Sequence, residues 1–375
     1  MTVSPDAFDA QEMLAGLRPW IECESPSYDA AAVNRMMDVA ARDFALAGGI
    51  VERIPGRGGF GDCVRVRFPH PRMGEPGILF LCHLDTVHPI GTLQTLPFEV
   101  RGERCYGPAI LDMKGGTFAA LRAVRQVWAE GRQGLPVTFL LTSDEEAGTP
   151  STRDLVKAEA QRNRYVLLPE RCRPDGGVVV GRSTVARFDL KVTGRPSHAL
   201  ARASAGRSAV REMAHRIIEI EEMTTPEHSF AVGVVHGGQW INCVPILCEA
   251  QAMVVASTQS GLDAGIAKLM AQAGERNGAT LTVTHTSTRP LWTPNPASLA
   301  AYEQVRAIAA GLGMEVGQGV NGGGSDGNFT GSLGIATIDG LGLRGDGNHT
   351  LEEHIQVASL AERARLMAGL VAQLA

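Results

Sequence analysis

Two adjacent glutamates, Glu145 and Glu146, follow an apolar run in the segment SDEEAGT at residues 143–149. Like charges repel, and neighbouring residues seldom point the same way, so the pair is poorly suited to one shared task. Carboxylates act either as acid–base groups or as ligands of divalent cations. The segment therefore raises the question whether the two glutamates share one role or have two different ones. In isolation, the pair is also explained by an acidic loop exposed to solvent.

Histidines and carboxylates also follow other apolar runs or lie in turns. In HLD at 83–85, His83 and Asp85 share one face of the expected strand, so Asp85 can accept the second ring N–H of a ligating His83. Each segment alone has an ordinary explanation, such as a polar strand end at HLD or a helix N-cap at Asp112. The remaining segments are LDMKGG with Asp112, PE with Glu170 and GNHT with His349.

The elements that must position these residues form an α/β sheet. Continuous apolar runs at 77–85, 136–146 and 164–170 suit buried strands, and residues 115–130 suit a helix. Alternating strands and helices favour parallel strands, and ligands bind beyond the carboxyl ends of such strands. The side chains can therefore converge there, and imidazole and carboxylate donors without thiolates suit zinc or a similar divalent ion.

The pattern changes near residue 182, where alternating strands and an amphipathic helix begin. Strand, helix, strand, strand, helix and strand follow in order, which predicts a compact α+β unit of ferredoxin-like type. A proline-rich linker at 289–296 leads out of it. We therefore predict a mostly parallel α/β catalytic domain at 1–181 and 291–375, interrupted by an inserted domain at 182–290.

Bulk properties limit the classes of protein. A chain of 375 residues exceeds a single typical core and indicates two domains. The net charge of −5 argues against nucleic acid, and no apolar run reaches membrane-spanning length. The seven cysteines are scattered without a CxxC pair, and the N-terminus lacks a signal-peptide pattern. We therefore expect a cytoplasmic protein with reduced thiols that binds neither nucleic acid nor membrane.

A family resemblance is carried by the run LFLCHLDTVHPIGTLQTLPFEVRGERCYGPAILDMKGG. It resembles the di-zinc metallopeptidases and amidohydrolases that include folate-cleaving glutamate carboxypeptidases, aminoacylases and succinyl-diaminopimelate desuccinylase. The match continues in order through TSDEEAGTPSTR, VTGRPSHA, INCVP and the segment from GGGSDG to GNHTLEEHI, over almost the whole chain. The motifs HLDTVHP and GPAILDMKGG resemble the carboxypeptidase branch most.

The resemblance implies a site for two Zn²⁺ ions per subunit, with Co²⁺ or Mn²⁺ as possible substitutes. In this family Asp112 would bridge the ions and precede a cis peptide bond to Met113. One ion would be held by His83, Asp112 and Glu170, and the other by Asp112, Glu146 and His349.

The resemblance also implies catalytic and substrate-binding roles. Glu145 would be the general base and Asp85 would orient His83, so the adjacent glutamates would have different tasks. The inserted domain would be a lid and dimerisation domain, whose His198 reaches the partner's active site and stabilises the oxyanion. Asn242 and Arg289 would hold the substrate carboxylate and carbonyl. Alone, a histidine after a strand is more often structural, and Arg289 could form a linker salt bridge.

The expected protein is a homodimeric zinc hydrolase, either a carboxypeptidase or an N-acyl-amino-acid amidohydrolase. It would cleave an amide or peptide bond in an N-acyl amino acid or short peptide and release an amino acid with a free carboxylate. Glu170 favours this over an aminopeptidase, because amino-end-trimming relatives tend to carry Asp there. A desuccinylase and a catalytically dead binding protein are the alternatives, but the sequence retains every ligand and the base. Leu200 and Arg171 depart from the family pattern.

Overall fold

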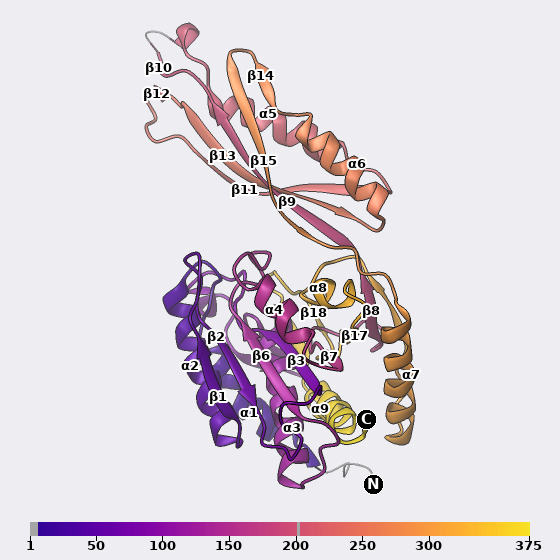
Figure 1. Ribbon diagram of the computed structural model, residues 1–375. Helices are drawn as coiled ribbons and strands as arrows, with labels where there is room; N and C mark the ends of the chain where they lie inside the picture. Colours follow the sequence, from indigo (N-terminus) through magenta and orange to yellow (C-terminus); the bar gives the residue numbers. More distant parts are fainter. Residues whose placement is uncertain (1–6, 201–202) are drawn as a thin grey trace. The chain divides into compact units, whose positions relative to one another are not determined.

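The computed structural model describes residues 7–200 and 203–375 (Figure 1). The described chain divides into two compact units. Unit 1 contains residues 7–181, 292–321 and 325–375, and unit 2 contains the described residues of 182–291 together with 322–324. The chain re-enters unit 1 at Trp292, within the proline-rich segment expected as a linker. The side chain of Trp292 is fully buried.

The main sheet of unit 1 has six strands in the order β1-β2-β6-β3-β7-β17. The pairs β6–β3, β3–β7 and β7–β17 are parallel, whereas β1–β2 and β2–β6 are antiparallel. The expected α/β fold with a mostly parallel main sheet is thus confirmed. The strands are β1 Ile50–Ile54, β2 Cys63–Arg67, β3 Ile78–His83, β6 Val137–Thr142, β7 Tyr165–Leu167 and β17 Ala336–Ile338.

Both faces of this sheet are covered, which explains the continuous apolar runs in β3 and β6. Alternate residues of β3 belong to different cores: Phe80 packs in the larger core, whereas Leu79 and Leu81 pack in the smaller one. Residues of α1 Ala10–Ile21, α2 Ala30–Leu46, α3 Gly115–Ala129 and α9 Ala358–Gln373 line the larger core. The smaller core contains residues of α4 Arg153–Ala160 and α8 Gly327–Gly331.

The rest of unit 1 consists of short strands and one further long helix, α7 Pro296–Gly311. A second sheet has the order β18-β19-β5-β4, and β8 pairs with β16. The sequence patterns did not predict β1, β2 or the strands of this second sheet, because they are short and not uniformly apolar. Their bounds are β4 Glu99–Arg101, β5 Arg104–Tyr106, β8 Val178–Arg182, β16 Gln318–Asn321, β18 Gly345–Asp346 and β19 His354–Gln356.

Unit 2 is an antiparallel sheet with two helices, in the strand order β11-β13-β9-β15-β14. Its helices α5 Ala209–Glu222 and α6 Gln259–Met270 share a core with alternate residues of the strands. A separate ladder joins β10 to β12. The strands are β9 Thr184–Thr193, β10 Ser197–His198, β11 His228–Gly237, β12 Cys243–Val244, β13 Leu247–Ala256, β14 Gly274–Arg276 and β15 Ala279–Arg289.

Candidate active site

Polar side chains from several loops of unit 1 meet beyond the carboxyl ends of the parallel strands. His83 is the last residue of β3, Glu145 and Glu146 lie in the turn after β6, and Glu170 follows β7. Asp112 lies in the irregular turn Ile110–Lys114 that leads into α3. His349 lies between β18 and β19, where its φ of 64° is left-handed. The fold therefore brings the candidate ligands together from segments distant in sequence.

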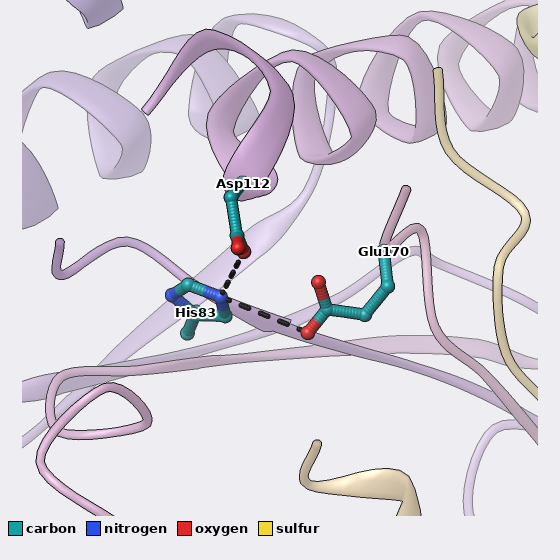
Figure 2. Close-up of side chains that lie close together, drawn as sticks. All are labelled: His83, Asp112 and Glu170. Atoms are coloured by element: carbon teal, nitrogen blue, oxygen red, sulfur yellow. Dashed lines mark hydrogen bonds and ion pairs between the residues drawn. The ribbon is translucent and has the colours of Figure 1, made fainter. Parts of the chain in front are cut away.

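The first cluster consists of His83, Asp112 and Glu170 (Figure 2). The Nε2 atom of His83 lies 3.2 Å from Oδ1 of Asp112 and 3.7 Å from Oε1 of Glu170. On the other side of the ring, Nδ1 lies 3.1 Å from the backbone carbonyl oxygen of Asp85. A carbonyl can only accept, so Nδ1 carries a hydrogen. Burial opposes protonation of the ring, but hydrogen bonds to Asp112 and Asp85 outweigh it and hold the pKa of His83 well above its usual range, so without a cation Nε2 also carries a hydrogen, which it directs at the carboxylates.

The second cluster consists of Asp112, Glu146 and His349. The Nε2 atom of His349 lies 3.2 Å from Oδ2 of Asp112 and 3.1 Å from Oε1 of Glu146. Asp112 therefore presents Oδ1 to the first cluster and Oδ2 to the second, the arrangement required of a bridging carboxylate. The peptide bond between Asp112 and Met113 is cis, as expected.

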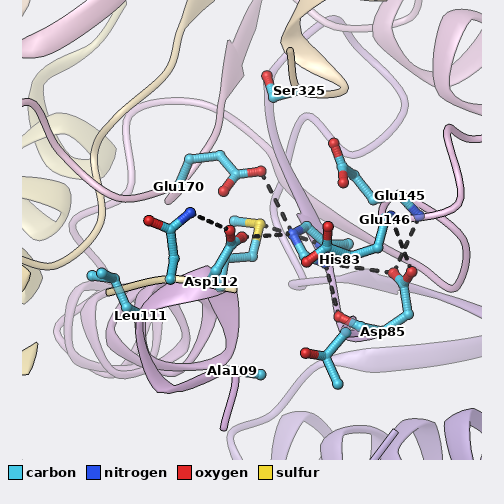
Figure 3. Close-up of polar contacts among 12 residues, drawn as sticks. His83, Asp85, Ala109, Leu111, Asp112, Glu145, Glu146, Glu170 and Ser325 are labelled. Atoms are coloured by element: carbon cyan, nitrogen blue, oxygen red, sulfur yellow. Dashed lines mark hydrogen bonds and ion pairs between the residues drawn. The ribbon is translucent and has the colours of Figure 1, made fainter. Parts of the chain in front are cut away.

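Asp85 anchors the two adjacent glutamates as well as contacting His83 (Figure 3). Its two carboxylate oxygens accept the backbone N–H groups of Glu145 at 3.2 Å and Glu146 at 3.1 Å. One of them also accepts the Ser27 hydroxyl at 2.6 Å, and the other lies 3.4 Å from Nδ1 of His83. From this shared anchor, only the Glu146 carboxylate enters a cluster of candidate ligands, while the carboxylate of buried Glu145 lies apart from it.

The charge state of the clusters fits a divalent cation. Burial, reinforced by the charge of Asp112, raises the pKa of Glu146 to about 7 and holds that of Glu170 well above its usual range. Burial opposes ionisation of Asp112 too, but hydrogen bonds from His349 and His83 outweigh it and lower its pKa. Hydrogen bonds to Asp112 and Glu146 raise the pKa of His349 to about 11. Without a cation, protons must offset the crowded carboxylates, so these donors suit a zinc-like ion.

His198 and Asn242 lie close together in unit 2. His198 pairs with Cys243 across the β10–β12 ladder, and the N–H of Ala199 donates to the Asn242 carbonyl at 3.0 Å. The backbone N–H of Leu200 donates to Nδ1 of His198 at 3.2 Å. Because Nδ1 accepts, the hydrogen of a neutral His198 ring is on Nε2, which is a hydrogen-bond donor on an exposed side chain.

Arg289 lies at the opposite end of the sheet in unit 2. It ends β15 and pairs with Val185 near the start of β9, whereas β10 follows the end of β9 (Figure 1). The eight residue steps from Val185 to Thr193 correspond to roughly 25 Å at the usual rise of a strand. The side chains of Arg289 and His198 from one chain therefore cannot both contact one small substrate.

Several polar residues around the clusters were not predicted. Asn348 donates to Oδ2 of Asp112 at 3.2 Å and accepts from Arg171 at 2.7 Å. Arg171 departs from the family pattern, yet here it connects the Glu170 loop to the His349 turn. Only proximity to His349 in the sequence could have indicated Asn348, and nothing in the sequence distinguished Ser27.

The chain matches the model of Peptidase family M20/M25/M40 over residues 79–373. It belongs to this family. Members are metallohydrolases that act on amide or peptide bonds, and the observed clusters supply donors for the metal. The chain is 28% identical over 309 residues to carboxypeptidase G2 of Pseudomonas sp. (strain RS-16), covering 80% of this chain and 74% of that protein.

The names of other similar proteins cover more than one activity. Succinyl-diaminopimelate desuccinylase of Acinetobacter baylyi is 26% identical over 321 residues, covering 80% of this chain and 84% of the relative. The structure of human carnosine dipeptidase 1 matches with a TM-score of 0.79 at 15% identity over 97% of each chain. A family M20 metallo-carboxypeptidase from Sulfolobus solfataricus has a TM-score of 0.71 at 14% identity, covering 97% of this chain and 99% of that one. At such identities the structural matches show the fold alone.

Among residues 7–200 and 203–375, no helix is both long and apolar enough to cross a membrane.

Proposed function

We propose that this protein is a two-zinc hydrolase that releases an amino acid with a free carboxylate from an N-acyl amino acid or short peptide. The observation that carries the proposal is the pair of donor clusters sharing Asp112, with buried Glu145 next to one of the ligands. The similarity to a carboxypeptidase over most of both chains supports this substrate class. A degenerate binding protein would be expected to lack a ligand or the base.

The two glutamates would then perform different steps. His83 and Glu170 would hold one ion, Glu146 and His349 the other, and Asp112 both. Bound zinc ions lower the pKa of water and polarise the scissile carbonyl. Glu145 would accept a proton from the attacking water on a carboxylate oxygen and return it to the leaving nitrogen. Asp85 fixes the backbone of Glu145, so the base is held in place before substrate binds.

Unit 2 would complete the site from two copies of the chain. Arg289, whose side chain is buried, would bind the substrate carboxylate through its planar guanidinium group, with Asn242 contacting the carbonyl. The Nε2–H group of His198 would donate to the developing oxyanion. Because Arg289 lies too far from His198 and the neighbouring Asn242 of the same chain for one small substrate, we propose that His198 and Asn242 come from the second subunit of a homodimer. Unit 2 would then be the dimerisation domain.

A substrate screen tests the proposed class. Zinc-loaded protein should release amine from N-acyl amino acids or dipeptides, and the same compounds with an amidated carboxyl end should be poor substrates. N-succinyl amino acids belong in the screen because a desuccinylase is the second candidate, supported by the Acinetobacter relative. Removing the metal with a chelator should abolish the activity, and added zinc should restore it. Equal cleavage of acids and amides, or no hydrolysis by protein holding both ions, would contradict the proposal.

Metal binding should release protons. His349, with a pKa near 11, is protonated in the metal-free protein throughout the neutral range, and the ion must displace that proton. Glu146 titrates near pH 7, so a further proton must leave below that pH. Apparent metal affinity should therefore rise with pH, more steeply below pH 7 than above it. Calorimetry in buffers of different ionisation enthalpy would count the protons, and a count of zero would contradict this charge assignment.

A further inference from the structure

One buried carboxylate outside both metal clusters holds the turn that carries Asp112. Glu353, immediately before β19, is fully buried. Its Oε1 accepts the backbone N–H groups of Leu111 at 2.8 Å and Asp112 at 3.1 Å. Its Oε2 accepts the N–H of Ala109 at 3.0 Å. Figure 3 shows Ala109 and Leu111 beside Asp112 in this turn. The Glu353 carboxylate therefore accepts three backbone N–H groups, that of the bridging ligand Asp112 and two from the residues just before it.

Glu353 also reaches the loop that follows β3. Its Oε2 lies 2.8 Å from Nε2 of His88, which is itself buried. Since an ionised carboxylate has no hydrogen to donate, His88 is the donor in this pair. His88 belongs to the loop that begins after His83, the histidine of the first cluster. Glu353 itself ends the segment 347–353, which contains His349 of the second cluster. The backbone N–H of Gly107 donates to the backbone carbonyl of Glu353 at 3.3 Å and so holds this segment in place.

We propose that Glu353, with His88, is a positioning residue that fixes Asp112 relative to the histidines of both metal sites. The proposal rests on the proposed metal sites. The Glu353 carboxylate contacts the loop after His83 through His88 and the turn of Asp112 through backbone N–H groups. Glu353 itself belongs to the segment that contains His349. A bridging ligand must present its two oxygens in two directions at once, so a small rotation of its backbone disturbs both sites. Groups that hydrogen-bond to metal ligands usually affect metal affinity or activity by about 10–100-fold.

Glu353→Gln is the most direct test. The amide keeps one acceptor oxygen, which can still accept from Leu111 and Asp112. Its NH₂ group, however, must face the N–H of Ala109, so two donors oppose each other. In metal-free protein, we expect hydrogen exchange of the Ala109, Leu111 and Asp112 amides to become faster. In a Co²⁺ titration followed by visible absorption, we expect the Kd to rise about 10–100-fold.

Glu352→Gln is the matched control, because it removes the same charge from the neighbouring, exposed residue. An exposed charge is screened by solvent, so its Co²⁺ affinity should stay within about threefold of the unsubstituted protein. A second pair of variants, at His88, tests the proposal even if Glu353→Gln does not fold. His88→Gln retains a side-chain N–H donor and should preserve most of the affinity, whereas His88→Ala should lose it.

The proposal is overturned if Glu353→Gln leaves amide exchange unchanged or binds Co²⁺ as Glu352→Gln does. It is also overturned if both His88 variants bind Co²⁺ as tightly as the unsubstituted protein. Failure of the metal sites themselves is distinguishable, because the unsubstituted protein would then bind no Co²⁺ even though its amide exchange still depended on Glu353.

Discussion

Glu145→Ala should lose most of its turnover while retaining both metal ions. Glu145 is buried next to the candidate ligands but belongs to neither cluster, so its removal takes away the proposed base and leaves the donors in place. A positioned acid–base group typically contributes about 10²–10⁴-fold to kcat, and a loss of that size is expected. Single-substrate kinetics together with elemental analysis of the purified variant would measure both quantities.

Glu146→Ala is the matched comparison at the adjacent position. Its carboxylate oxygen lies 3.1 Å from Nε2 of His349 in the second cluster, so this variant should bind less metal. Both backbone N–H groups donate to Asp85, and an alanine at either position keeps that hydrogen bond. The anchoring of the turn is therefore the same in the two variants. Equal metal loss in both would mean that the division of roles is wrong.

Mixing His198→Ala with Glu145→Ala should restore activity that neither variant has alone. His198→Ala should keep its metal ions and lose about 10²–10³-fold in kcat, the usual cost of removing one oxyanion donor. If His198 acts on the partner's site, each mixed dimer has one complete site, with Glu145 from one chain and His198 from the other. The expected rate is about half of the wild-type rate per mixed dimer, because one site of two is intact.

Two controls make the mixing experiment decisive. Subunit exchange must be verified with differently tagged chains. His215→Ala removes an exposed histidine from the same unit and should retain the activity of the unsubstituted protein. No recovery after verified exchange would mean that His198 acts within its own chain or has no catalytic role. A monomeric protein with full activity would exclude the two-chain site altogether.

The sequence by itself determined the elements that present the site. The runs that became β3, β6 and β7 are mostly apolar because both faces of the sheet are buried, and candidate ligands occur only at or after the last residue of each strand. The positions of His83, Glu146 and Glu170 at the carboxyl ends of successive strands along the chain thus follow from the sequence pattern, whereas the structure shows that these strands are neighbours in the sheet. Residue types alone indicated a nitrogen- and oxygen-ligated metal.

Only the tertiary structure decided which of these side chains meet and what holds them. His349 and Glu146 are 203 residues apart in the chain, and no local pattern specifies their contact of 3.1 Å. The sequence related Asp85 to His83, whereas the fold also uses it to anchor Glu145 and Glu146. Glu353 resembles any other glutamate in GNHTLEEHI, and only its burial against three backbone N–H groups distinguishes it from exposed Glu352. The physical reason is that periodicity reports burial along one element, whereas the site is made of contacts between loops that the packing of whole elements brings together.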